Sequence, residues 1–392
     1  MAFMPQRPVP VAASSFICER LPTLFRPKLP ERADPLNFRR ERSDGIDASL
    51  RQDHHHAAMD QFSAHLDRGW DLVQRGDPRG AELSARRALE IDSQSPEAYN
   101  LLGYVAALKG EFDEATEHYR QAIALDDTYL EAMLNAAEVY VHPLGDFEEA
   151  LSLCDQALDL AETDDEVVDA LLLKFDALLG KGEADAASEL CRRFPEGPFE
   201  NPNHTFLVGR ALYEIGDLDR AFPLIDDAVK RNVKNAEAWY YLGLLRDERG
   251  DSHGATAAFL ASRDLDLELG TPPWSLSRET FEMTARGALA SLPEELRRFV
   301  REDEVYAADV PGVEVVVDGV DPRALLLLDG VNAGATIATM TARVFVYQRN
   351  VERLAGSVEH VAAEIRAALE REISATFLEP DGPLAVSQKT LN

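Results

Sequence analysis

Alanines recur at a nearly constant spacing through the first two-thirds of this chain. They are separated by 34, 35, 37, 34 and 34 residues and are Ala81, Ala115, Ala150, Ala187, Ala221 and Ala255. Glycine pairs such as Gly76 and Gly110 keep the same step. A fixed period of this size indicates stacked supersecondary units, each too small to bury its apolar face alone. The sequence therefore predicts a stack of units that share one continuous core, an architecture that usually binds other proteins.

The residues around these alanines form a pattern of an aromatic residue, a Leu-Gly pair, an Ala-x3-aromatic motif and a final Asp. Two good copies are Tyr99, Leu102, Gly103, Ala115, Tyr119, Ala122 and Asp126, and Trp239, Leu242, Gly243, Ala255, Phe259 and Asp266. The pattern resembles the tetratricopeptide repeat family. This resemblance implies helix pairs, in which a small residue at the helix crossing permits close approach and an aromatic ring fills the space beside it.

The pattern predicts six helix pairs, in residues 62–95, 96–129, 130–164, 165–201, 202–235 and 236–268. The third pair contains one extra residue, at His142-Pro143-Leu144 in its inter-helix turn. The fourth lacks the Leu-Gly pair and carries three extra residues around Pro195–Pro198. Because Pro and Gly favour turns, these additions are expected to leave the flanking helices intact but to offset the stack.

The regions outside the repeats differ in composition. Residues 1–57 are rich in Pro and Arg, show no periodicity and are predicted to be disordered, with translation from Met59 as an alternative. The array over 62–268 is followed by a linker at 269–276, a second domain at 277–378 and a flexible tail at 379–392. The predicted fold class is mainly α: a helical solenoid of about six helix pairs, followed by a small α+β domain.

The location of the chain is expected to be cytoplasmic. Prolines and charged residues interrupt the N-terminal segment, so it lacks a secretory apolar core, and no apolar run approaches the roughly 20 residues that span a bilayer. Cys154 and Cys191 each stand four residues after a repeat alanine, where other copies carry Tyr119 or Phe259, so both are predicted to be buried. No membrane partner is expected.

The net charge of −30 is unevenly distributed. Residues 1–53 contain nine basic and seven acidic residues, which leaves 31 basic and 63 acidic residues for the remainder. An acidic field repels nucleic acid and favours basic protein partners, although the charge also serves solubility alone. We therefore expect a protein partner, with a basic one favoured, and no nucleic acid.

The first helix of each pair lines the binding groove in the repeat family, so the resemblance implies that its exposed residues contact the partner. By helical register these candidates are Glu97, Asn100, Tyr104, Glu131, Glu138, Phe206, Arg210, Tyr213, Tyr240, Asp247 and Glu248. A solvated face without a ligand is the alternative. The family's carboxylate clamp for peptide C-termini uses Lys and Asn, and Lys is absent from these positions, which argues against that mode.

The last third of the chain is predicted to be a different, α+β domain. Two helices broken at Pro293 are expected between Ser277 and Val300, strands at Val313–Val317 and Val344–Tyr347, and a long helix from about Ser357 to Phe377. A proline-flanked Trp274 is expected to cover the end of the repeat array.

The order of these elements, together with Phe281 and the stretch Ala288–Leu296, resembles the minimal zincins, a small bacterial zinc-metallopeptidase-like family. In active relatives, His-Glu-x-x-His on the final helix holds zinc and supplies a general base. The matching stretch here has Arg371 and Ala375 in place of the two histidines and retains only Glu372. A guanidinium repels a dication and a methyl group cannot coordinate one, so no metal or other cofactor is predicted.

Two classes of function are compatible with these observations. The first is a non-enzymatic interaction scaffold with a pseudo-metallopeptidase domain as a second docking or regulatory surface. The second is a metal-dependent hydrolase with a site rebuilt around Glu372, in which Asp381 and Glu379 stand near an outer ligand position. Loss of both histidines favours the first class, and then Glu372 is expected to pair with Arg371 or a neighbouring base.

Overall fold

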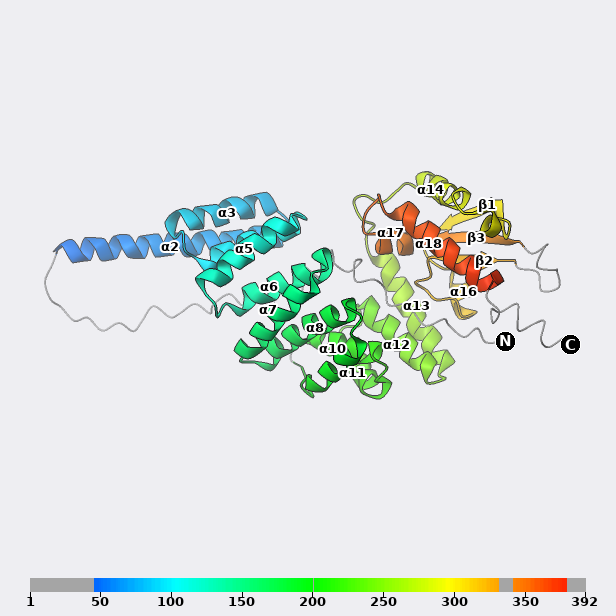
Figure 1. Ribbon diagram of the computed structural model, residues 1–392, viewed down its shortest axis with the longest axis horizontal. Coiled ribbons are helices and arrows are strands. Elements are labelled where there is room, and N and C mark those ends of the chain that lie inside the picture. Colours follow the sequence, from blue (N-terminus) through cyan, green and yellow to red (C-terminus); the bar gives the residue numbers. More distant parts are fainter. Residues whose placement is uncertain (1–45, 200, 331–340, 379–392) are drawn as a thin grey trace. The chain divides into compact units, whose positions relative to one another are not determined.

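A computed structural model describes the backbone of residues 46–199, 201–330 and 341–378, and the side chains from Met59 onward. The chain divides into two compact units, with residues 16–216 in the first and residues 217–392 in the second. Helices dominate both, as the sequence predicts, and a small sheet occurs only in the second among the described residues (Figure 1).

The first unit is helical throughout its described part. Its elements are α2 (Ile46–Gln74), α3 (Pro78–Ile91), α4 (Pro96–Leu108), α5 (Phe112–Leu125), α6 (Leu130–Val139), η2 (Tyr140–Leu144), α7 (Phe147–Leu160), α8 (Asp164–Gly180), α9 (Ala184–Leu190), η3 (Cys191–Arg193) and α10 (Pro202–Glu214).

The second unit begins with three helices and continues into a mixed domain. Its elements are α11 (Leu218–Arg231), α12 (Ala236–Glu248), α13 (Ser252–Glu268), α14 (Arg278–Ala290), α15 (Glu294–Arg297), β1 (Val300–Ala308), α16 (Val313–Val317), β2 (Leu326–Asp329), β3 (Ala342–Tyr347), α17 (Gln348–Ala355), α18 (Val361–Ile373) and η5 (Ser374–Leu378).

Each predicted repeat range contains two helices, and local sequence explains where they start and turn. Ser95 and Asn235 cap α4 and α12 by accepting hydrogen bonds from the backbone N–H groups of Ala98 and Ala238. Gly110 and Gly250 lie between the two helices of their pairs with φ of 78° and 77°, where side chains are strained. The recurring glycines therefore mark the intra-repeat turns.

Close helix contact depends on the two glycines of the Leu-Gly pairs. A Cβ atom on Gly103 would lie 2.6 Å from the ring of Tyr119, and one on Gly243 would lie 2.4 Å from the ring of Phe259. Real Cβ atoms do not approach ring carbons this closely. The glycine and the aromatic ring therefore form one packing unit in each of these repeats, as the resemblance implies.

The extra residue of the third repeat is accommodated by a π-helical turn. The last residues of α6 pass into η2, which contains Pro143 and ends at Gly145 in the left-handed conformation. The wider turn absorbs one residue, and α7 still begins at Phe147. In the fourth repeat, the second helix α9 has only seven residues and passes into the 3₁₀ turn η3 before the inserted residues.

The mixed domain of the second unit is built on a three-stranded sheet of order β1-β3-β2. Strand β1 pairs with β3 in parallel, and β2 pairs with β3 antiparallel. Helices α14 and α18 pack on one another and on the sheet, and α18 lies across the strands in the view of Figure 1. Phe281, Phe299 and Ile365 are among the buried side chains of the resulting core.

The linker is attached to this mixed domain. The buried Glu352 of α17 accepts hydrogen bonds from the Ser275 hydroxyl at 2.8 Å and from the Leu276 N–H at 3.0 Å. Trp274 packs against the hydrophobic core of the same domain. This differs from the expected role of Trp274 as a cover for the repeat array, because the buried glutamate fixes the linker on the domain that follows it.

The predicted helices on either side of Pro293 are confirmed as α14 and α15, and the strand at Val344–Tyr347 is confirmed within β3. The predicted strand at Val313–Val317 is wrong, because these residues form α16. Val316 is buried while Val313 and Val317 are 45% and 56% exposed, so one helical face contacts the protein. The contact of α16 with α13 outweighs the β propensity of valine.

Further boundaries differ from the expected ones. Helix α2 begins at Ile46, so residues 46–57 are helical rather than disordered, while residues 1–45 lie outside the described part. The long C-terminal helix begins at Val361 rather than near Ser357, and it ends in the π-helical turn η5. The sequence does not predict the strands β1 and β2. Charged residues interrupt the apolar pattern of β1, and β2 is a short run of leucines.

Candidate protein-binding surface of the repeats

Four first helices of the repeats, α4, α6, α8 and α10, lie next to one another in the first unit. We call the surface that carries their polar and aromatic side chains the first-helix surface. The first helix of the last repeat, α12, belongs to the second unit. The predicted partner-binding residues are therefore divided between the two units.

The structure buries more of the predicted residues than expected. Glu97 and Glu248 are exposed, and Glu131, Tyr213 and Asp247 are partly exposed. The other six have at most 8% of their surface exposed and are Asn100, Tyr104, Glu138, Phe206, Arg210 and Tyr240. The expectation that these six are exposed is wrong, because polar or aromatic side chains of neighbouring elements cover them. Their role in partner binding stays a prediction.

A hydrogen-bonded network joins α4 to α6. The amide nitrogen of Asn100 donates to the hydroxyl of Tyr129 at 3.2 Å and to Glu131 Oε1 at 3.0 Å, while its amide oxygen accepts from Asn135 at 3.0 Å. Burial raises the pKa of Glu131 to about 7, although the hydrogen bond from Asn100 opposes this shift. Glu131 is therefore partly protonated near neutral pH.

A second cluster, which we call the His142 cluster, contains Glu138, His142, Asp176 and Arg210 from α6, η2, α8 and α10. His142 Nε2 lies 3.5 Å from Glu138 Oε1 and 3.7 Å from Asp176 Oδ2. The Arg210 guanidinium lies 3.4 Å from Asp176 and 3.4 Å from Glu214. The Arg210 guanidinium thus lies beside two carboxylates, while Glu138 lies beside His142.

His204 of α10 joins that helix to α8 through two carboxylates. Its Nδ1 lies 3.1 Å from Asp165 and its Nε2 lies 2.8 Å from Asp169, and its side chain is 3% exposed. Burial opposes the charged imidazolium, but the two carboxylates outweigh it and raise the pKa of His204 above its ordinary value. A protonated ring donates at both nitrogens and so satisfies both carboxylates.

Sequence reasoning does not select His142, Asp176 or His204 as site residues. Taken individually, the histidines indicate packing or surface positions, because no short motif connects them with carboxylates on other helices. One signal does exist for His142, since it lies in the single-residue insertion of the third repeat. An irregularity in an otherwise periodic array is the feature that could have identified it.

In the second unit, the mixed domain covers the side chain of Tyr240 on α12. The hydroxyl of Tyr240 donates to Asp321 at 2.8 Å, and the Arg323 guanidinium lies 4.5 Å from the centre of the Tyr240 ring. Arg323 is also 3.9 Å from Glu237 on α12. Burial raises the pKa of Asp321 and that of Tyr240 above their ordinary values. Tyr240 is thus occupied by a segment of its own chain.

The end of α13 is bound by arginines of the same domain. Asp266, whose side chain is 3% exposed, pairs with Arg323 at 3.2 Å and with Arg353 at 3.0 Å. Arg349 donates to the carbonyl groups of Leu267 and Leu269 at 3.0 and 2.8 Å. Because the last carbonyls of a helix lack intrahelical partners, these bonds satisfy groups that would otherwise face solvent. The last helix pair and the mixed domain therefore form one body.

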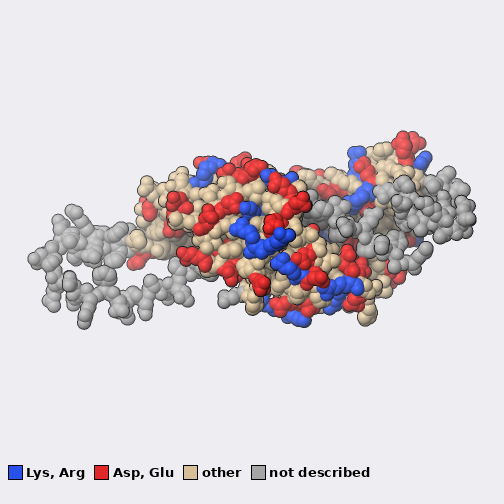
Figure 2. Space-filling view, turned by 60° about the horizontal axis from the view of Figure 1, so that its bottom comes forward, with Lys and Arg blue, Asp and Glu red and all other residues tan. Residues whose placement is uncertain are grey.

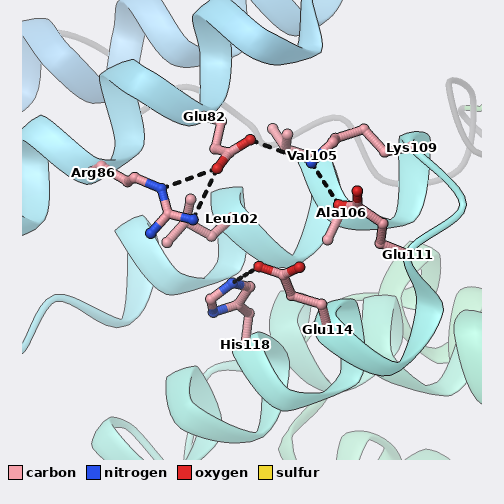
Figure 3. Close-up of a pocket in the computed structure, with 9 residues that line it drawn as sticks. All are labelled: Glu82, Arg86, Leu102, Val105, Ala106, Lys109, Glu111, Glu114 and His118. Carbon is pink, nitrogen blue, oxygen red and sulfur yellow. Dashed lines mark hydrogen bonds and ion pairs between the residues drawn. The ribbon is translucent and has the colours of Figure 1, made fainter.

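A small open hollow lies elsewhere in the first unit, among α3, α4 and α5 (Figure 3). Leu102, Val105 and Ala106 are among its apolar lining residues, and charged side chains surround it. Lys109 pairs with Glu82 at 3.3 Å and with Glu111 at 2.5 Å. The hydrogen bond from Arg86 outweighs burial and lowers the pKa of Glu82. Since these charges are paired with one another, the hollow offers no obvious ligand chemistry.

The described surface is predominantly acidic. Figure 2 shows Asp and Glu side chains spread over one face, with Lys and Arg interspersed. This distribution agrees with the excess of acidic residues after residue 53. Lys and Arg side chains gather mainly in a band near the middle of this face.

The stretch Arg371–Ala375 near the end of the C-terminal helix has the pairing expected for a helix surface. Arg371 Nε donates to Glu372 Oε1 at 3.1 Å, and Ala375 lies in η5. The carboxylates of Glu379 and Asp381 lie outside the described residues. Within the described ranges, no group of three or more His, Cys, Asp or Glu side chains is arranged to hold a metal ion. Likewise, none of the described helices has the length and apolarity needed to cross a membrane.

The two cysteines of the repeats behave as predicted from their positions. Cys154 and Cys191 are both buried, and neither forms a disulfide bond within the described residues. Burial raises the pKa of Cys154 to about 12, so its thiol stays protonated at neutral pH. These residues serve packing in the slots that Tyr119 and Phe259 fill elsewhere.

Comparison with known proteins supports the interpretation of the repeats. One family model of the tetratricopeptide repeat matches residues 66–129 and 207–266, and a second matches residues 132–168. The chain is 31% identical over 153 residues to Hsp70-Hsp90 organizing protein 3 of Arabidopsis thaliana. This match covers 39% of the chain but only 25% of the length of that relative.

Solved structures with similarity to the chain include two bacterial proteins. PilF of Pseudomonas aeruginosa is 21% identical, with 54% of this chain and 95% of PilF covered at a TM-score of 0.47. TTC0263, a tetratricopeptide repeat protein of Thermus thermophilus, is 20% identical, with 47% and 98% covered at a TM-score of 0.39. From the family models and the helix pairs together, we conclude that this chain contains tetratricopeptide repeats.

Proposed function

We propose that this protein is a non-catalytic scaffold that binds a basic segment of a partner protein on its first-helix surface. Tetratricopeptide repeat proteins mediate protein–protein interaction, which supports the general class. The observation that carries the proposal is the continuous set of polar side chains contributed by α4, α6, α8 and α10, in which carboxylates outnumber cations. Such a surface complements a basic partner electrostatically.

The character of the partner does not follow from the similarity to the Arabidopsis chaperone organizer. The first-helix positions singled out from the sequence contain no Lys, which argues against binding of a peptide C-terminal carboxylate. Their exposed or partly exposed members include Glu97 and Glu131, both acidic. A positively charged internal segment of a partner satisfies these groups better than a negatively charged terminus does.

The mixed domain is proposed to act without catalysis, as a second docking or regulatory surface. Two observations support this part: Arg371 and Ala375 replace the metal ligands expected from the zincin resemblance, and Glu372 is paired with Arg371. The strand at Val313–Val317 that contributed to the resemblance is a helix, so the zincin-like identity of the domain rests on fewer elements. The cytoplasmic location stays a prediction.

Site-specific photo-crosslinking tests the proposed surface. A photo-reactive amino acid is placed at Glu97 or Tyr213 on the first-helix surface, or at the exposed Glu117 and Glu149 on second helices as matched controls. The full-length chain then captures its partner from an extract of the source cells. We expect crosslinks from Glu97 and Tyr213 that decrease as salt rises, because exposed charges are screened within about 8 Å at physiological ionic strength.

The opposite pattern contradicts the proposal. Crosslinks that form only from Glu117 and Glu149 would assign binding to the second helices. Crosslinks from the first-helix positions could also be equally strong at low and high salt. That result would argue against a basic partner and for one that is bound through aromatic contacts such as Tyr213.

A further inference from the structure

The three-stranded sheet of the mixed domain has two unlike faces. Its inner face carries Val305, Val344 and Leu326, which are buried in the core of the domain. The helices in most extensive contact with the strands, α14, α15, α17 and α18, contribute side chains to the same core. Successive residues of a strand point to opposite sides, so the residues in between point to the opposite face. We call this second face the outer sheet face.

A row of apolar side chains crosses the outer sheet face. Tyr306 of β1 and Leu327 of β2 both stand opposite Phe345 of β3 in the strand register. The rings of Tyr306 and Phe345 stack with their centres 5.3 Å apart. Tyr306 is 43% exposed, and Phe345 and Leu327 are partly exposed. Tyr347, the next outward residue of β3, is 3% exposed, so the accessible part of the face ends at this row.

The adjacent row contains one charge of each sign. Asp329 of β2 stands opposite Arg343 of β3, and the two side chains form an ion pair while they are 41% and 42% exposed. The Arg343 guanidinium also lies 5.9 Å from the centre of the Phe345 ring. These two rows are therefore neutral, although the chain after residue 53 carries 31 basic and 63 acidic residues. The acidic surface in general repels a second copy of the chain, whereas these rows do not.

The edge of the sheet at β1 is occupied by side chains of its own domain. Arg286 donates to the carbonyl group of Val305 at 3.0 Å, and Arg278 donates to that of Ala307 at 2.6 Å. Both arginines belong to α14. Edge carbonyl groups without such partners invite pairing with a further strand. The occupied carbonyl groups favour the outer sheet face over this edge as a docking surface.

The strand register makes the outer sheet face complementary to itself. Two copies can stack through this face, about 10 Å apart, around a two-fold axis that runs along the strands between β2 and β3. The axis exchanges β2 with β3 and keeps each row in place. Phe345 of one copy then faces Leu327 of the second copy, and Arg343 faces Asp329, because these are the residue pairs of the register. Each contact occurs twice, as in an isologous interface.

We propose that the outer sheet face joins two copies of this chain in a two-fold symmetric dimer. This inference specifies the docking role that the proposed function gives to the mixed domain, and it rests on the proposed function in that respect. Three strands that share four residues cover on the order of 200 Å² per copy. A stable interface of standard size buries about 800 Å² per partner. The dimer is therefore weak, and its population depends on the protein concentration.

Analytical ultracentrifugation of the full-length chain tests the proposal. The parent chain is measured from about 1 to 300 μM, since a small interface gives weak association. We expect the average mass to rise from that of one chain towards that of two. Tyr306→Glu should prevent this rise, because it places a charge in the apolar row. Met283→Glu is the matched control, since Met283 is 61% exposed on α14 of the same domain, and it should leave the association unchanged.

An exchange of charges tests the symmetry of the contact. Arg343→Asp and Asp329→Arg each place like charges opposite one another in the dimer, so each should weaken association at least about tenfold. In an equal mixture of the two variants, unlike copies carry complementary charges, and association should return. A fluorescent label on one variant identifies these unlike pairs. The Arg343–Asp329 pair within one chain is exposed and adds little stability, so we expect both variants to fold.

Three results overturn the inference. They are a parent chain that stays monomeric throughout the concentration range, a dimer that persists in Tyr306→Glu and in both charge variants, and a mixture that associates no better than the single variants. The first result comes from the parent chain alone, so a folding defect in a variant does not affect it.

The outcome for the dimer is separable from that for partner binding, because no partner protein is present in the ultracentrifuge. If the chain stays monomeric while crosslinking from Glu97 still captures a partner, only self-association fails. If the chain dimerises but no first-helix position captures a partner, the dimer stands and binding on the first-helix surface fails.

Discussion

The first helices of the repeats meet two different situations in this molecule. In the first unit, side chains of α4, α6, α8 and α10 pair with one another and leave buried polar atoms without partners among the described residues. In the second unit, Tyr240 of α12 has both its ring and its hydroxyl engaged by the mixed domain. First-helix side chains therefore find their partners within the repeats in the first unit, whereas Tyr240 in the second unit finds its partners in the mixed domain.

This difference shows how a repeat position acquires its role. The helix periodicity gives all first helices the same orientation within their pairs, but the chemistry on their outer side depends on which segment of the chain packs against them. Tyr240 and Asp321 are 81 positions apart in the sequence, yet their side chains are in contact. A repeat that precedes a domain of another fold can become part of the hydrophobic and ionic interface of that domain.

The largest expected effect is at the ionic contact of the second unit. Asp266→Ala leaves the guanidinium groups of Arg323 and Arg353 without their shared carboxylate, and we expect a loss of about 3 to 5 kcal/mol in the free energy of unfolding of this unit. Urea unfolding followed by the fluorescence of Trp239 and Trp274, in a Trp70→Phe background, measures it. Asp264→Ala removes a 68% exposed carboxylate and should change the free energy little. Equal effects of the two substitutions would refute the importance of the buried pair.

The next effect is a gain of stability in the first unit. The pKa of Glu131 is raised to about 7, which means that the folded state favours the neutral carboxyl group. The stability of the unit is therefore highest below the ordinary glutamate pKa of 4.5, and it falls as pH rises through about 7. Glu131→Gln keeps an acceptor for Asn100 and removes this loss, so at pH 8 the variant should be more stable by up to about 3 kcal/mol. Unfolding is followed through Trp70 after replacement of Trp239 and Trp274 by Phe. A variant less stable than the parent at pH 8 would contradict the assigned burial.

A smaller effect is expected from the histidine that joins α8 and α10. Because the folded pKa of His204 is raised, its stabilisation is fully present below an ordinary histidine pKa of about 6.5 and is lost as pH rises through the folded value. His204→Gln should cost about 2 kcal/mol at pH 5.5, since two hydrogen bonds to carboxylates are weakened. The cost should decrease at higher pH. The same Trp70 measurement applies, and a cost that grows with pH would exclude the charged bridge.

The smallest expected effect is at the hydroxyl group of Tyr240, on the repeat helix α12 that the mixed domain covers. Tyr240→Phe retains the ring beneath Arg323 but removes the donor to Asp321, and we expect a loss of about 1 kcal/mol in the second unit. Tyr306→Phe is the matched control, because Tyr306 is 43% exposed. If Tyr240→Phe behaves like this control, the comparison between α12 and the first-helix surface depends on the arginines alone.

The periodic part of the fold was predictable from sequence, and the site was predictable only in part. Small residues and aromatics at fixed spacing specify local helix pairs, which is why Gly103 and Tyr119 could be assigned a shared packing role. Helical register also selected Asn100 and Arg210 correctly as first-helix residues. It could not show that Asn135 and Asp176 bury them, because those partners come from other repeats.

The mixed domain was harder to predict for the same physical reason. The valines of Val313–Val317 have strand propensity, but the contact of this segment with α13 favours a helix. Strand β1 carries the charged run Arg301–Glu304 at the edge of the sheet, where solvent tolerates it. Periodicity is informative where contacts are local and repeated, and it loses its value where single long-range contacts decide the structure.

The bonds from Arg349 to the last carbonyl groups of α13 have a practical consequence for protein engineering. A repeat array that ends in solvent normally carries a specialised terminal helix with a polar outer face. Here the mixed domain covers the end of the repeat array, and it also neutralises Asp266. A fragment cut after Glu268 would expose both the helix end and the covered side of Tyr240, so a soluble minimal array requires an added capping helix rather than a stop codon at the repeat boundary.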